Sequence, residues 1–319
     1  MRKACVFFMI LLLLPVFPEA SAAEEAPIPI TDRAGLEAIA EAPAAEYRLE
    51  TDIDMSGTDW IPFAFSGTLD GNGHTVEGLH IIMTGSETRE TLDGNRKGYE
   101  TVFAGLFSVM EGAVIKDLTI GNAVIEAECM QSCFIAGIAG YAADCGIYNC
   151  GVTGRFMLSV KDGVNVGAGG LVGYMDSCSV ENCVLDTELI VADRNTETVC
   201  EQFAGGIYAS GRGKVKNCSV KTRIWASAHG YVHNGGCIGM AFWVHRKDKY
   251  KQYLYDCESD TEITFFEHSP SKRSYSDPYI GENLGSNCHL RNNKKKHFIS
   301  TKVREYDTVL LPDGPYARR

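Results

Sequence analysis

The phrase AGIAG at residues 136–140 recurs along the chain and decides the fold. Its further copies are GGLVG at 169–173, GGIYA at 205–209, GGCIG at 235–239 and a weaker GENLG at 281–285. A second phrase follows each copy: YNC at 148–150, ENC at 181–183, KNC at 216–218, YDC at 255–257 and SNC at 286–288. The cysteines that end this second phrase are 33, 35, 39 and 31 residues apart. Self-similarity at such a period indicates a repeat architecture.

Each repeat has the composition of strands and turns. Paired glycines weaken a helix interior, and no apolar stripe of helical period appears in these segments. Short apolar runs broken by Gly, Asn and Asp are typical of strands. In the second copy we predict strands at residues 170–174, 179–185 and 188–192. Three strands per repeat predict an all-β fold, a right-handed parallel β-helix with three-stranded coils, in which equivalent residues of successive coils stack in columns.

Two such columns are expected inside the coils. Leu171, Ile207 and Cys237 would form an apolar column, and the cysteines of the second phrase would form another, namely Cys150, Cys183, Cys218, Cys257 and Cys288. Stacked coils hold equivalent Cα atoms about 4.8 Å apart, within the range that a disulfide spans. The candidate disulfides are Cys145–Cys178, Cys150–Cys183 and the local pair Cys129–Cys133. The alternative is a column of buried thiols, since cysteine also packs as a small apolar residue.

The first residues have the features of a secretory signal peptide, which we assign to residues 1–22. Arg2 and Lys3 precede an apolar stretch at residues 6–17, and ASA at 20–22 is a small-residue cleavage site. The apolar stretch is too short for a comfortable membrane span, and no other segment is apolar enough for one. We therefore expect a secreted or cell-surface protein with no membrane span after cleavage of the signal.

The mature chain reads as one elongated domain. Residues 23–82 are expected to form an N-terminal cap and the first coil, and residues 101–290 the repeats. Residues 83–100 are polar and without pattern, which favours a loop projecting from the first coils, either a binding element or a passive insertion. Residues 291–319 would form a C-terminal cap or tail. We expect the protein to be a monomer.

A short capping helix is predicted at residues 33–41. Asp32 or Thr31 is a suitable N-cap, and Leu36, Ile39 and Ala40 would lie on the buried side of this helix. An amphipathic helix of this kind covers the open end of a solenoid, which would otherwise expose its core.

The sequence contains no complete metal or cofactor motif. Residues 52–59 imitate the start of a calcium loop, but the twelfth position is Phe63 where a bidentate glutamate is required. We interpret the aspartates of this segment as turn and cap formers. No Cys-x-x-Cys or closely spaced His pair has zinc-ligand spacing. We expect neither a metal nor a cofactor.

The N-terminal motifs resemble those of a known family. In order, they are DIDMSG at 52–57, WIP at 60–62, FSGTLDGNGHTV at 65–76 and GLF at 105–107. This order resembles the secreted and surface-attached bacterial proteins that carry GLUG-motif repeats, over about residues 30–257. The resemblance implies a right-handed parallel β-helix, and either a role in adhesion or a place beside a separate catalytic domain. It implies no catalytic residue, because the repeats of that family carry none that are established.

The charge is unevenly distributed along the mature chain. Residues 23–244 carry 14 basic and 29 acidic side chains, and residues 245–319 carry 14 basic and 11 acidic ones. The acidic body argues against a nucleic acid partner, because such partners require basic surfaces.

Catalysis is the alternative to a binding role, because cleavage of polysaccharides by hydrolysis or elimination uses carboxylates that meet on one face. Asp144 and Asp176 are the closest approach to such a pair, in the turn between the two phrases of successive coils. The next coil has Gly211 or Arg212 there. We assign no catalytic residue, and name these two aspartates as the carboxylates to test for a polysaccharide-degrading lyase or hydrolase.

Three tyrosines are the candidate binding residues. Tyr141, Tyr174 and Tyr208 occur within or just beyond successive copies of the first phrase, so they would stack along one face. They would either cover turn edges or offer a flat platform to a ligand. We predict a non-enzymatic binding or adhesion module whose partner is an extracellular polysaccharide or a host or cell-surface protein.

Overall fold

The computed structural model describes residues 26–84, 101–129, 132–160, 165–193, 200–228, 230–241, 252–267, 273–283 and 288–303. The predicted signal peptide lies outside the described residues, as does the predicted loop apart from Met83 and Thr84. No helix within the described part of the chain has the length and hydropathy needed to cross a bilayer.

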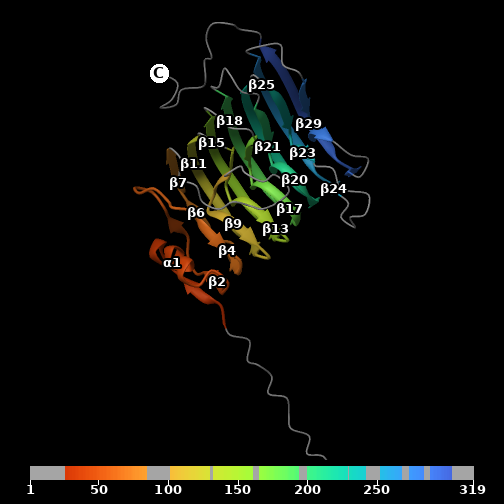
Figure 1. Cartoon of the computed structure of the whole chain (residues 1–319). Helices are drawn as coiled ribbons and strands as arrows, with labels where there is room; N and C mark the ends of the chain where they lie inside the picture. Colours follow the sequence, from red (N-terminus) through yellow and green to blue (C-terminus); the bar gives the residue numbers. More distant parts are fainter. Residues whose placement is uncertain are drawn as a thin grey trace, which may run out of the picture.

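The described strands wind into a parallel β-solenoid of about five turns with three sheets (Figure 1). The 14-stranded sheet contains β1 (Ile28–Ile30), β2 (Glu46–Leu49), β4 (Phe63–Phe65), β5 (Thr68–Asp70), β9 (Phe107–Glu111), β10 (Val114–Lys116), β13 (Ala139–Ala143), β14 (Gly146–Tyr148), β17 (Val172–Glu181), β20 (Tyr208–Lys216), β23 (Ile238–Ala241), β24 (Gln252–Tyr255), β27 (Ile280–Asn283) and β28 (Cys288–Arg291). The nine-stranded sheet contains β3 (Ile53–Asp54), β6 (Thr75–Glu77), β7 (His80–Thr84), β11 (Thr119–Cys129), β15 (Gly151–Val160), β18 (Val184–Asp193), β21 (Ser219–Ala228), β25 (Glu258–Glu267) and β29 (Lys294–Val303). The six-stranded sheet contains β8 (Thr101–Ala104), β12 (Ser132–Ala136), β16 (Asn165–Gly169), β19 (Glu201–Gly205), β22 (Tyr231–Gly235) and β26 (Arg273–Asp277).

One full coil passes through the three sheets in turn, as in β16, β17 and β18. Each of these strands pairs in parallel with its equivalent in the next coil. This confirms a parallel β-helix with three-stranded coils. The predicted strand boundaries in this copy were wrong, because β17 runs on past the left-handed turn residue Ser177 (φ 59°) and takes in the segment predicted as a separate strand.

The first phrase forms the turn between the six-stranded and the 14-stranded sheet. Backbone hydrogen bonds join Leu171 to Ile207 and Ile207 to Cys237 in successive coils. All three side chains are fully buried, which confirms the predicted apolar column. The glycine before each member is required by close packing. A Cβ atom on Gly206 would lie 2.3 Å from the carbonyl oxygen of Gly236 in the next coil.

The last copy of both phrases differs from the prediction. Strand pairing aligns Gly235 with Asp277 and Ile238 with Ile280, so the last copy of the first phrase is residues 277–281 and not GENLG at 281–285. The carboxylate of Asp277 accepts hydrogen bonds from two backbone N–H groups of this turn. In this copy an aspartate that binds the turn backbone stands where the three copies before it have a glycine. The glycine pattern therefore could not identify it in the sequence.

Cys288 does not lie in the cysteine column. Its register partner is Gln252 of β24, and the position that follows Cys257 in the column is Asn293, whose Oδ1 accepts a hydrogen bond from the Cys257 N–H at 2.9 Å. The column position after Cys257 thus comes later in the chain, at Asn293, than the SNC phrase at residues 286–288 implied. The nine-stranded sheet also continues to β29, past the predicted end of the repeats at residue 290.

A helical segment covers the N-terminal end of the core, as predicted (Figure 1). It consists of α1 (Arg33–Ala38) and the 3₁₀-helix η1 (Ile39–Glu41), and the Asp32 carboxylate accepts a hydrogen bond from the Gly35 N–H. Leu36 and Ile39 are buried. Ala40 is exposed, contrary to the prediction, because the tighter 3₁₀ turn begins at Ile39.

The aspartates of residues 52–59 are turn formers, as the sequence suggested. Hydrogen bonds from the Thr75 N–H and from His74 lower the pKa of Asp52. The hydroxyl and N–H of Ser56 lower the pKa of Asp54. The carbonyl oxygens of the same segment bind the Arg33 guanidinium, which joins the capping helix to residues Met55, Thr58 and Asp59.

Candidate functional site

Two of the three candidate tyrosines form a stacked pair on the outer side of the solenoid. Tyr141 of β13 and Tyr174 of β17 are register partners, with ring centroids 5.7 Å apart and an interplanar angle of 14°. Phe103 and Phe134 of the six-stranded sheet pack against these rings at 5.5 and 5.6 Å. Both tyrosines are therefore half-buried, and they close the outer corner between two sheets while keeping part of their surface in solvent.

Tyr208 is not part of this face, so the prediction of a three-tyrosine platform was wrong. It pairs with Val172 and Ile238, and its side chain is fully buried in the main core. The register partner of Tyr174 in that coil is Ser210. Tyr208 therefore occupies the position of Val172, whose side chain is also buried in the main core.

A charged pair lies beside the tyrosines. Asp176 of β17 binds Arg212 of β20 through both carboxylate oxygens, one of them to Nη2 at 3.2 Å, and it also accepts a hydrogen bond from Ser177. Burial, followed by the negative charge of Asp176, raises the pKa of Tyr141 above its usual range.

Asp144 and Asp176 do not occupy matching positions. Strand pairing places Asp176 opposite Ala143. The next residues, Asp144 and Ser177, are the equivalent turn residues of the two coils, with left-handed φ angles of 53° and 59°. Asp144 is exposed and Asp176 is bound to Arg212. The two carboxylates therefore do not stack in one column of equivalent side chains.

Ten cysteines between Cys129 and Cys257 are buried, with free thiols in the structure. Cys145 and Cys178 lie in adjacent coils, where the Cys145 N–H donates to Sγ of Cys178 at 3.3 Å. Cys150 and Cys183 precede the register partners Gly151 and Val184, so they too lie in adjacent coils. The three disulfides remain predictions. Burial raises the pKa of the Cys237 thiol well above its ordinary value, so this cysteine packs as an apolar side chain.

The turn between the 14-stranded and the nine-stranded sheets carries a column of side-chain amides that was not predicted. The residue before each column cysteine has a left-handed φ of 53–59°, a conformation that Asn and Asp tolerate well. Asn149, Asn182 and Asn217 each donate from Nδ2 to the side chain one coil earlier, at 2.9, 3.0 and 2.8 Å. The recurring Asn before Cys was the available signal.

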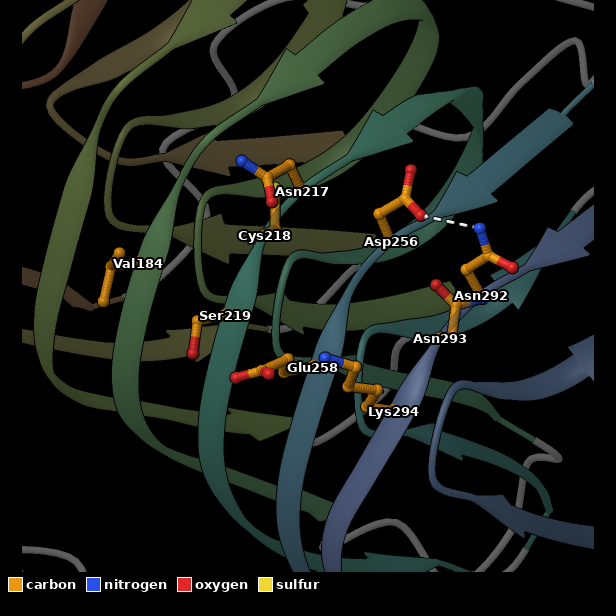
Figure 2. A pocket seen from close by; sticks show the side chains of 9 residues that line it. All are labelled: Val184, Asn217, Cys218, Ser219, Asp256, Glu258, Asn292, Asn293 and Lys294. Carbon is orange, nitrogen blue, oxygen red and sulfur yellow. Dashed lines mark hydrogen bonds between the residues drawn. The ribbon is translucent and has the colours of Figure 1, made fainter.

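A cleft of about 830 Å³ lies where this column is interrupted, and Figure 2 shows its lining. Asp256 takes the place of an asparagine here. Its carboxylate accepts a hydrogen bond from Asn292 at 3.1 Å, but it has no amide to donate toward Asn217. Within the described part of the chain no cluster of side chains is suited to hold a metal ion.

Restoring the asparagine column is expected to stabilise the fold. Asp256→Asn would supply the missing donor to Asn217 and raise the free energy of unfolding by about 1 kcal/mol. The matched exchange Asn182→Asp removes the Nδ2 group that donates to Asn149 at 3.0 Å. It is expected to lower the free energy of unfolding by a similar amount. Denaturant unfolding of both variants measures the effect. Equal shifts of the same sign would contradict the role of the column.

The outer side of the nine-stranded sheet carries charges of alternating sign. Asp186, Lys221, Asp260 and His297 succeed one another by register, and so do Arg155, Glu188, Arg223 and Glu262. Ion pairs join neighbouring coils, for example Lys221 with Asp186 at 2.7 Å. Like charges stacked at this spacing would repel, so the alternation serves coil stacking and leaves no excess of one sign for a ligand.

The comparisons with known proteins identify the fold alone. The chain is similar to the crystal structure of a candidate immunoglobulin A1 protease from Bacteroides ovatus, with a TM-score of 0.63 and 17% identity over 90% of this chain and 80% of that chain. A structure named IgA1 protease matches with a TM-score of 0.49 and 14% identity over 86% of this chain and 21% of that chain. No protein-family model and no curated protein matches the chain. The resemblance to GLUG-motif proteins thus stays a resemblance, and the chain is a parallel β-solenoid similar in fold to the Bacteroides ovatus structure.

Proposed function

We propose that this protein is a non-enzymatic, extracellular binding module that recognises a polysaccharide at the Tyr141–Tyr174 pair. The observation that carries the proposal is the arrangement of these two half-exposed rings beside the Asp176–Arg212 ion pair. Aromatic rings pack against the apolar faces of sugars, and a neighbouring carboxylate and guanidinium offer an acceptor and donors to sugar hydroxyls. The predicted signal peptide supports an extracellular location.

The proposal is tested by incubating the full chain with plant, host and bacterial cell-wall polysaccharides. We expect retention of at least one polymer without release of new reducing or unsaturated ends. Tyr141→Ala with Tyr174→Ala should weaken retention about tenfold, because the sugar contact is lost. The conservative pair Tyr141→Phe with Tyr174→Phe keeps the rings and their packing against Phe103 and Phe134 and should retain most binding, which separates the contribution of the rings from that of the hydroxyl groups.

The same experiment includes the alternatives. Cleavage of any polymer would contradict the non-enzymatic role, and Asp176→Asn would then be compared with Asp144→Asn. Immunoglobulin A1 belongs in the panel, because the similar Bacteroides ovatus structure is described as a candidate protease of that protein. Cleavage of immunoglobulin A1 would likewise overturn the proposal, and binding of a protein but of no polysaccharide would replace the ligand class.

A further inference from the structure

A second group of side chains on the outer face of the 14-stranded sheet has an order that no repeat motif predicted. In β20, β24 and β28, the register aligns Lys214 with Tyr253 and His289, and two positions further on it aligns Lys216 with Tyr255 and Arg291. Each row thus holds a tyrosine between two basic residues. We call these six residues the basic–aromatic array.

The tyrosines of the array form a connected aromatic surface. The Tyr253 ring lies 5.2 Å from the Tyr255 ring and stacks on the His289 imidazole at 5.4 Å and 20°. Both tyrosines are half-exposed. Their rings are therefore held in place by one another and remain open to a ligand.

The basic residues of the array are available to an anion. Lys214, Lys216, His289 and Arg291 are exposed, and none of them forms an ion pair among the residues that the structure describes. The nearest acidic groups are otherwise engaged or at the edge. Asp256 accepts a hydrogen bond from Asn292 in the cleft of Figure 2, Glu258 pairs with Lys296 at 2.5 Å, and Glu181 is the register neighbour of Lys216 one coil earlier.

The spacing of the array suits a chain of charged rings. Neighbouring side chains within a row are about 4.8 Å apart and the two rows are about 6.8 Å apart. The lysines, His289 and Arg291 therefore mark the corners of a rectangle of roughly 7 by 10 Å, with the two tyrosines across its middle. A sugar ring over a tyrosine would then hold its anionic substituents near basic side chains on either side. The protein has a net charge of −11, so most of its surface repels an anion. The array is a local cationic surface to which an anionic ligand is attracted.

We infer that the basic–aromatic array binds an anionic polysaccharide, one whose rings carry carboxylate or sulfate groups. The inference rests on residues other than the Tyr141–Tyr174 pair, and it does not depend on the function proposed there. Binding combines charge attraction with ring stacking, and these two contributions respond differently to salt.

The repeat supplies matched controls for each half of the array. Lys116 is the residue equivalent to Lys216 in an earlier coil, and Tyr148 is equivalent to Tyr255 in another. Both lie outside the array on the same outer column. Lys116 forms an ion pair with Asp70 at 3.0 Å, whereas Lys216 forms none among the described residues.

The test measures the affinity of the full chain for heparin, polygalacturonate, neutral dextran and single-stranded DNA at two salt concentrations. We expect heparin or polygalacturonate to bind and to weaken as salt rises, with dextran unbound; the stronger polymer identifies sulfate or carboxylate as the anion. Lys214→Gln with Lys216→Gln should weaken binding about tenfold and flatten the salt dependence. Tyr255→Ala should weaken it about fivefold at both salt concentrations.

The controls decide the outcome. Lys116→Gln and Tyr148→Ala should stay within about twofold of the unaltered chain. Equal effects of control and array variants, binding of dextran as tight as that of the charged polymers, DNA binding as tight as either, or no binding at all would each overturn the inference. A loss of charged-polymer binding in Tyr141→Ala with Tyr174→Ala as large as that in Lys214→Gln with Lys216→Gln would also overturn the inference, because it would not assign the binding to the array.

Discussion

Replacing Gly206 by alanine is expected to lower the free energy of unfolding by about 3 kcal/mol, with a fall in the thermal midpoint on the order of 10 °C. An added Cβ would lie 2.3 Å from the Gly236 carbonyl oxygen and equally close to a methyl group of Val220. The first contact is with backbone, which cannot move away without breaking the hydrogen bonds between coils. The neighbouring coil must therefore shift or separate locally.

Gly151→Ala is the matched control for this change. It also lies at the junction of two sheets, but the atoms nearest to its added Cβ belong to the partly exposed Thr119 side chain, at 3.2 Å and beyond. We expect a change of less than about 0.5 kcal/mol, since alanine also restricts the unfolded chain. Thermal and denaturant unfolding of both variants provide the comparison. Similar losses at the two positions would show that close packing at the first phrase is not what fixes its glycine.

The stability of the fold is expected to fall by about 3 kcal/mol between pH 6.5 and pH 4 through His233 alone. This side chain is only 3% exposed and lies between Phe203 and Tyr275, at ring distances of 5.2 and 5.6 Å. Burial lowers its pKa from 6.5 to about 4. The unfolded chain therefore binds a proton in this window that the folded chain excludes. The stabilisation is complete above pH 6.5 and is lost as the pH falls to 4.

His233→Phe isolates this contribution, because phenylalanine preserves the aromatic column and cannot be protonated. The difference in unfolding free energy between the variant and the original chain should grow by about 3 kcal/mol from pH 7 to pH 4. Carboxylates titrate in both proteins and cancel in the difference. His297→Gln serves as control, since that imidazole is 49% exposed. If the plots of unfolding free energy against pH for the original chain and His233→Phe stay parallel, the folded chain protonates His233 as readily as the unfolded chain does. The predicted contribution is then absent.

The candidate sites were only partly foreseeable. The tyrosines after two copies of the first phrase predicted the Tyr141–Tyr174 stack correctly, because both coils share the same alternation of inward and outward residues. Tyr208 occurs two positions earlier in its phrase than a tyrosine equivalent to Tyr174 would. It stands at the place of the buried Val172 and so lies in the core. The two aspartates are not register partners, because Asp176 pairs with Ala143, one residue before Asp144.

The sequence by itself determined the coil. Its period, its glycine turns and its recurring Asn before Cys are local requirements of chain geometry that each repeat must meet, and Asp32 marked the start of the capping helix in the same way. Only the tertiary structure decided which residues of different coils meet. The basic–aromatic array joins Lys214, Tyr253 and His289 across segments of unequal length, and the last copy of both phrases was displaced for that reason. Hydrogen bonding between coils, and not distance along the chain, sets the register, so the surface columns are known only when that pairing is known.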